Sequence, residues 1–194
     1  GPPYTFGFQI LGTGCGAVSQ NAIVDFNGVT YWMGSNAFYR YSGTVETLSC
    51  TVHGYVFDNL EDVQREKCFG FLNQAFDEIN WFYPTATLGE PDNYVTYNFK
   101  DQVWSIGTMD RTTWVDKGLF EYPLAYDSSG QGYNQEYGSD AAGSAMTASI
   151  ESADFDIGEG DQAMYVHRVF PDLEISGGDV DITTEGNEQK INNG

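Results

Sequence analysis

The fold is decided by the stretch AIVDFNGVTYWM, which runs from Ala22 to Met33. Within it, Asn27-Gly28 separates two runs of β-branched and aromatic residues. An Asn-Gly pair favours the type I′ turn, which joins two antiparallel strands and needs a positive φ at both central residues. We therefore predict a β-hairpin with strands over residues 22–26 and 29–33.

Two more strand-like runs follow this hairpin directly. Gly34-Ser35-Asn36 leads into residues 37–41, and Ser42-Gly43 leads into residues 45–52. Four antiparallel strands within roughly 30 residues have the size of one β-propeller blade. The first part of the chain is thus expected to form a four-stranded sheet.

The same strand pattern recurs further along the chain. Residues 58–67 read as a short helix inserted on a loop, because Asp58 can cap it and Arg65 and Lys67 stand near its end. Residues 84–93, rich in Gly, Pro, Asp and Thr, read as a loop. The predicted strands are 69–72, 78–83, 94–99 and 102–107 in a second unit, and 112–115, 119–126 and 131–137 in a third.

These repeats predict an all-β protein, a partial β-propeller of two to three four-stranded blades, with a β-sandwich as the rival fold. We assign residues 1–143 to the blades and residues 144–194 to a smaller acidic β unit with a polar C-terminal end. Strands are expected there over 163–170 and 178–182. Two or three blades cannot close a ring, so the chain is expected to be part of a longer protein.

The net charge of the chain disfavours two classes of function. The chain has 28 acidic and 8 basic side chains, a net charge of −20, and the acid excess is concentrated in residues 116–194. Nucleic-acid binding and attachment to anionic membranes both depend on Lys and Arg, so both are disfavoured. The three cysteines form no CxxC pair, and an odd number cannot complete a disulfide framework. Free, packed thiols are expected.

One acidic segment is a candidate metal site. Asp154, Asp156 and Asp161 flank Gly158 and Gly160, in a turn-like pattern that could present several oxygens to calcium. The segment lacks the remaining ligands of an EF-hand loop, and an acidic turn between two strands is the favoured interpretation. We therefore assign no metal and no cofactor.

Four acids are candidates for glycoside hydrolysis, which needs two carboxyl groups across a bound sugar. They lie at predicted strand ends among aromatic residues: Asp77, Glu78, Glu121 and Glu136. The alternative is that they bind backbone amides at these strand ends. The glycine-rich stretch 12–16 lacks the Lys of a phosphate-binding loop, and His53 and His167 read as packed residues. We assign no catalytic residue and expect no enzyme.

Several phrases of the sequence resemble a family of virion proteins from double-stranded DNA bacteriophages, the propeller-bearing tail-tube or nozzle proteins. This family is related in role to packaged-DNA stabilisation proteins. The resemblance spans about Pro3 to Ile182 and rests on packing phrases rather than catalytic ones. The phrases are 16–22, Tyr31-Trp32-Met33-Gly34, 78–84, 94–98, 104–114, Glu136-Tyr137-Gly138, 153–158 and 168–172.

The resemblance implies a structural virion component, made in the host cytoplasm, that forms a homo-oligomeric ring below the portal and adaptor. DNA would be retained by and ejected through its lumen without specific binding, and no membrane would be contacted. The resemblance implies no catalytic residue and no cofactor. Two other functions stay open: a glycan-binding or glycan-cleaving propeller for host-surface recognition, and a secreted calcium-dependent adhesion module.

Overall fold

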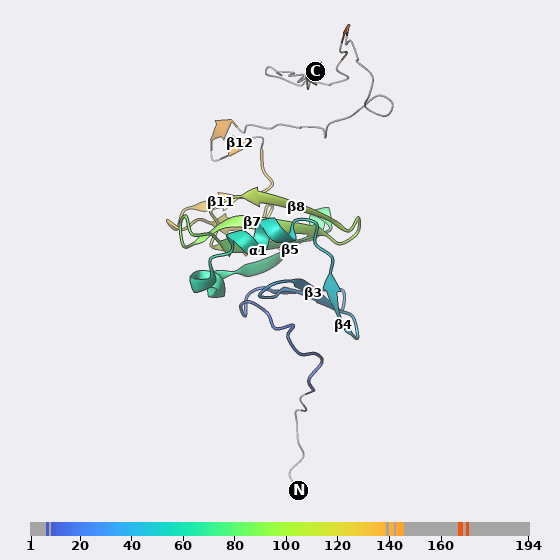
Figure 1. Cartoon of the computed structure of the whole chain (residues 1–194). Coiled ribbons are helices and arrows are strands. Elements are labelled where there is room, and N and C mark those ends of the chain that lie inside the picture. Colours follow the sequence, from blue (N-terminus) through green and yellow to red (C-terminus); the bar gives the residue numbers. More distant parts are fainter. Residues whose placement is uncertain are drawn as a thin grey trace, which may run out of the picture. The chain divides into compact units, whose positions relative to one another are not determined.

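The first four strands form one antiparallel sheet in chain order, in a computed structural model that describes residues 7, 9–138, 140–141, 143–145, 167–168 and 170 (Figure 1). The strands are β1 (Ile23–Phe26), β2 (Val29–Met33), β3 (Phe38–Tyr41) and β4 (Val45–Leu48). Asn27 and Gly28 have φ values of 49° and 79°, as the predicted type I′ turn requires. The hairpin prediction is confirmed.

The second sheet repeats this arrangement with longer strands. It contains β5 (Phe69–Asn73), β6 (Glu78–Pro84), β7 (Pro91–Asn98) and β8 (Val103–Thr108), again in chain order. The 3₁₀ turn η2 (Gln74–Phe76) joins β5 to β6. Strand β7 begins at Pro91 rather than at residue 94, because its pairing with β6 continues past a bulge to Pro84. The predicted loop 84–93 is correspondingly shorter.

The predicted helix over residues 58–67 is wrong in its bounds. The structure has an α-helix α1 (His53–Asn59) followed by a 3₁₀ helix η1 (Asp62–Lys67). Asp58 therefore lies in the last turn of α1 and caps nothing. Burial decides this placement, because Val52, Val56 and Leu60 recur at helical spacing and pack against the core. Strand β4 consequently ends at Leu48, four residues before the predicted end.

The main core lies between the two four-stranded sheets. Aromatic rings from both sheets meet there, with centroids 4.9 Å apart for Phe38 and Trp81 and 6.4 Å apart for Tyr31 and Tyr97. The Trp81 indole also donates a hydrogen bond of 3.0 Å to the Ala22 carbonyl, which precedes β1. Figure 1 shows the two sheets as blue and green layers, one above the other. The alternation of large apolar residues along β2 and β6 produces this interface.

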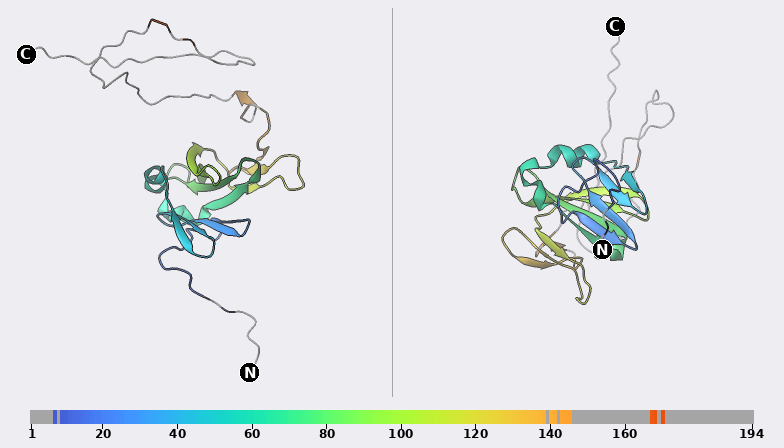
Figure 2. Two further views of the ribbon diagram at one scale, coloured as in Figure 1. Left: turned by 90° about the vertical axis from the view of Figure 1, so that its right-hand side faces the viewer. Right: turned by 90° about the horizontal axis from the view of Figure 1, so that it is seen from below.

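A third sheet has three short strands, β9 (Thr113–Val115), β10 (Leu124–Tyr126) and β11 (Gly132–Asn134), with β10 in the middle. The predicted strand 119–126 is wrong over its first residues, because Leu119 is fully exposed within a turn and only 124–126 pair. Trp114 of β9 stacks on Phe71 of β5 at 4.2 Å. Figure 2 shows these yellow strands beside the green sheet. A hairpin of β12 (Asp140–Ala141) and β13 (Ser144–Ala145) follows.

The chain divides into two compact units, residues 1–147 and 148–194. In the second unit the structure describes Arg168, whose guanidinium lies over the Phe170 ring at 5.4 Å. The strands predicted over 163–170 and 178–182 lie almost entirely outside the described residues. The calcium candidates Asp154, Asp156 and Asp161 lie outside them as well.

Candidate functional site

The fold brings two of the four candidate acids together. Glu78 begins β6 and is paired with Asn73 at the end of β5. Glu136 follows β11 in the left-handed region, with a φ of 56°, and this turn directs its side chain back toward β5. The Asn73 amide donates a hydrogen bond of 3.3 Å to the Glu136 carboxylate. We call Glu78 and Glu136 the carboxylate pair.

The environment of the carboxylate pair favours a proton on Glu78. Partial burial and then the negative charge of Glu136 raise the pKa of Glu78 above its ordinary value. Burial raises the pKa of Tyr94, and the same two carboxylates raise it further. A carboxyl group whose pKa is raised beside a second acid is suited to act as a proton donor.

The surrounding sheet face is polar at one end and aromatic at the other. Asn80 and Thr96 are buried opposite each other on β6 and β7, and the Thr96 hydroxyl donates a hydrogen bond to the Asn80 amide oxygen. The aromatic end contains Phe82, whose ring centroid lies 5.2 Å from those of Phe69 and Tyr94. These buried groups pack and bond with one another beside the carboxylate pair.

The other two candidate acids do not join this pair. Asp77 lies in a left-handed turn, and its carboxylate is 3.7 Å from the Lys100 ammonium. Glu121 lies in the loop before β10, where it lines a separate hollow with Tyr122. The contact of Asp77 is thus with a lysine side chain, not with a backbone amide.

The glycine-rich stretch 12–16 presents carbonyl groups rather than amides to its neighbours. The Trp32 indole donates a hydrogen bond of 2.7 Å to the Cys15 carbonyl, and the Tyr39 hydroxyl donates one of 3.3 Å to the Gly14 carbonyl. These bonds fix the stretch against the face of the first sheet that points away from the core.

A larger pocket of about 710 Å³ opens between α1, the loop after β6 and the end of β8. Its three acids are Asp58, Asp92 and Asp110. The Asp92 carboxylate accepts hydrogen bonds of 2.9 Å and 2.6 Å from the backbone and hydroxyl of Thr85. Asp110 likewise accepts bonds of 3.1 Å and 2.6 Å from Ser128. These two acids fix loops, and within the described ranges no three His, Cys, Asp or Glu side chains could hold a metal ion.

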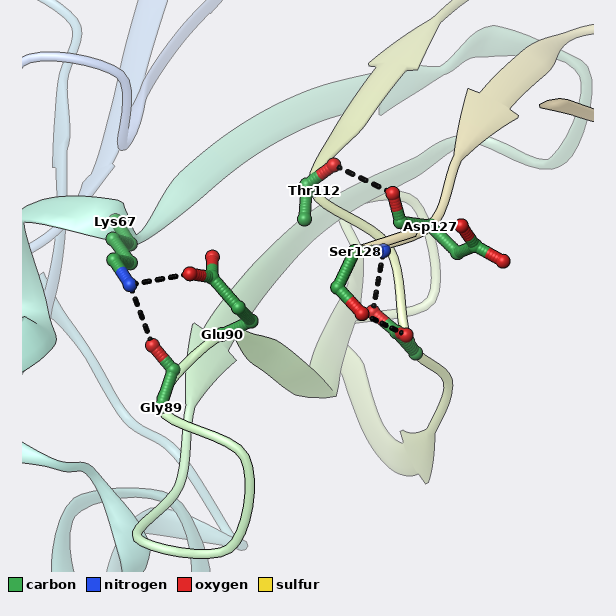
Figure 3. A network of polar contacts seen from close by, with 7 residues as sticks. Lys67, Gly89, Glu90, Thr112, Asp127 and Ser128 are labelled. Carbon is green, nitrogen blue, oxygen red and sulfur yellow. Dashed lines mark hydrogen bonds and ion pairs between the residues drawn. The ribbon is translucent and has the colours of Figure 1, made fainter. Parts of the chain in front are cut away.

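Figure 3 shows how such contacts tie loops to the two sheets. The Lys67 ammonium donates hydrogen bonds to the Glu90 carboxylate and to the Gly89 carbonyl, at 2.5 Å and 2.7 Å. Hydrogen bonds, first from the Ser129 hydroxyl and then from Gln131 and Tyr133, lower the pKa of Asp127 to about 2. Its ionised form thereby fixes the turn over residues 127–130.

The basic side chains between Arg40 and Lys100 are engaged by acids. Four ion pairs join Arg40 to Glu46, Arg65 to Asp62, Lys67 to Glu90 and Lys100 to Asp77. The Arg111 guanidinium lies over the Tyr133 ring at 4.3 Å. A cluster of cations for phosphate groups therefore does not form along residues 9–111 of the described chain.

The sequence matches no known protein family and no curated protein. In the part of the chain that the structure describes, no helix is long and apolar enough to cross a membrane.

The charge of Glu78 is expected to destabilise the fold at neutral pH. Its raised pKa in the folded state means that ionisation costs stability above that pKa, and that the cost disappears as the pH falls below the pKa of the unfolded chain. Glu78→Gln should therefore raise the urea midpoint at pH 7–8, with no gain near pH 3. The matched control is Glu66→Gln, which changes an exposed glutamate on η1. Equal effects of the two substitutions at pH 7–8 would contradict the burial argument.

Proposed function

We propose that this chain is part of a structural virion component, a segment of a bacteriophage tail or nozzle conduit below the portal. The observation that carries the proposal is the succession of antiparallel sheets along the chain. Two four-stranded sheets pack face to face, and a third sheet joins the second through the Trp114–Phe71 stack. Blades of a propeller follow one another in this manner, each a chain-ordered antiparallel sheet.

The resemblance of the packing phrases to the nozzle family supports a role for these sheets in a phage tail. Two of the tryptophans in those phrases lie between the large sheets: Trp81 is buried in the core, and Trp104 packs against Phe38 of the first sheet at 4.8 Å. Such residues serve assembly rather than catalysis. Within the virion, the proposed partners are further copies of the chain in a ring and the adjoining tail, adaptor and portal proteins.

The acidic surface suits a channel wall along which DNA must move. Phosphate binding releases counterions only where Lys and Arg neutralise the DNA backbone, and here acids already engage Arg40, Arg65, Lys67 and Lys100. A net charge of −20 repels the duplex further. DNA would therefore pass along this channel wall without binding to it.

The chain is accordingly expected not to bind duplex DNA, even at low salt. Fluorescence anisotropy with a labelled duplex should stay flat at about 20 mM salt up to about 100 μM protein. Micromolar binding that weakens with added salt would overturn the conduit mechanism. Gold-labelled antibodies against the chain test the virion assignment separately, since they should mark the tail vertex of intact particles. Labelling that is absent from particles would contradict it.

The carboxylate pair favours one other function, glycan binding or cleavage. Glu78 and Glu136 meet beside Asn73 and Tyr94, and the pKa of Glu78 is raised, as a general acid requires. A glycan array probed with the intact chain decides between the two functions. Binding or hydrolysis that is lost in Glu78→Gln and Glu136→Gln would favour this second function.

A further inference from the structure

A second hollow, of about 410 Å³, lies on the outer side of the third sheet. Leu124 of β10 and Asn134 of β11 are directly paired and form its floor. The loop before β10 and the segment after β11 supply the remaining residues. The six lining residues are Phe120, Glu121, Tyr122, Leu124, Asn134 and Tyr137, and we call this set the aromatic cage.

The rings of the cage stand at an angle to one another. The centroids of Tyr122 and Tyr137 are 4.7 Å apart, and their planes are inclined by 58°. Phe120 and Tyr137 are 55 % and 61 % exposed, so both rings offer free surface to a ligand. Rings that meet at such an angle form two walls of a corner rather than one flat platform.

The charge of the cage is negative. Glu121 contributes the only charged side chain of the lining, and Asn134 contributes a carboxamide. Interaction with the adjacent Glu121 carboxylate raises the pKa of Tyr122, so the acid lies beside this ring wall. The faces of aromatic rings also carry negative potential. Both features attract a positive charge to the same small volume.

We propose that the aromatic cage binds an alkylammonium group. One carboxylate and one carboxamide supply too few oxygens for calcium, which takes six to eight. An alkylammonium group uses the rings as well, because its carbon atoms contact their faces while its charge is drawn to ring and carboxylate. The same group occurs on a lysine side chain of a partner protein and on a free polyamine. This inference does not depend on the proposed function.

The test is an NMR titration of the full chain with Nα-acetyl-lysine methylamide. Its uncharged counterpart is Nα-acetyl-norleucine methylamide, which has nearly the same shape. We expect the lysine derivative to bind in the millimolar range and to shift the ring signals of Phe120, Tyr122 and Tyr137. It should bind about tenfold more tightly than the norleucine derivative. Equal affinity would overturn the proposal.

Two further probes identify the source of the cation. Spermidine that binds much more tightly than the lysine derivative would support the site and assign it to polyamines. Similar affinity per ammonium group would support it and assign it to a lysine side chain. A neutral methyl glycoside that binds when neither amine does would overturn the proposal.

Matched variants separate the cage from general effects of charge and folding. Glu121→Gln should weaken binding about three- to tenfold. Asp116→Asn, which removes a charge from the same loop outside the cage, should leave binding unchanged. Tyr137→Ala should abolish the shifts, whereas Tyr126→Ala, at an exposed tyrosine of β10 outside the lining, should retain them. Equal effects of Glu121→Gln and Asp116→Asn would contradict a specific site.

Discussion

Trp81→Ala is expected to destabilise the chain by about 3–5 kcal/mol, enough to unfold a domain of ordinary stability. The Trp81 side chain is completely buried between the two large sheets and contacts Phe38 and Trp104. Gly70, paired with it on β5, leaves the space that its indole fills, since a Cβ at that position would lie 2.9 Å from the ring. Removal of the indole thus opens a cavity that neither sheet can close.

Trp81→Phe separates packing from hydrogen bonding at this position. It keeps most of the ring but loses the 3.0 Å bond to the Ala22 carbonyl. That carbonyl still accepts a bond from the Met33 amide, so no buried acceptor is left unpaired and the loss should be smaller, about 1–3 kcal/mol. Urea denaturation followed by tryptophan fluorescence and circular dichroism measures both values. A cost below about 1 kcal/mol for Trp81→Ala would show that the interface is not the core of this unit.

The local sequence predicted the sheets well because the residues that favour strands there are also the residues that the core buries. The Asn27-Gly28 pair favours a tight turn, and the residue pattern on both sides of it favours two antiparallel strands. Both patterns therefore predict the same hairpin. The prediction of the helix bounds was wrong because the local capping signal conflicted with the burial of residues in the core. Asp58 is a good capping residue, but burial of Val56 set the helix start five residues earlier, at His53.

The carboxylate pair could be foreseen only in part. Glu78 and Glu136 were both recognised as strand-end acids, yet 58 positions separate them in the sequence. Their meeting depends on the pairing of Asn73 with Glu78 and on the left-handed conformation of Glu136, and no local pattern encodes either. The aromatic cage was missed for the same reason, since Tyr122 and Tyr137 lie on either side of a hairpin.

Trp114→Ala is expected to release the third sheet while the two large sheets stay folded. The Trp114 ring lies nearly parallel to Phe71, with an angle of 12° and a centroid distance of 4.2 Å. Loss of this stack should weaken the interaction between β9 and β5 by about 2–4 kcal/mol of free energy. Amide hydrogen exchange should therefore accelerate at least tenfold in β9, β10 and β11, with little change in β6 and β7.

Trp114→Phe is the matched control, because it preserves a stacked ring on Phe71 and should keep most of the protection. The indole nitrogen of Trp114 is buried without a hydrogen-bond partner, so its removal should cost little by itself. Faster exchange throughout all three sheets in Trp114→Ala would mean that they unfold as one unit. Exchange confined to β9–β11 would instead mean that the third sheet opens independently of the two large sheets, to which the Trp114–Phe71 stack joins it.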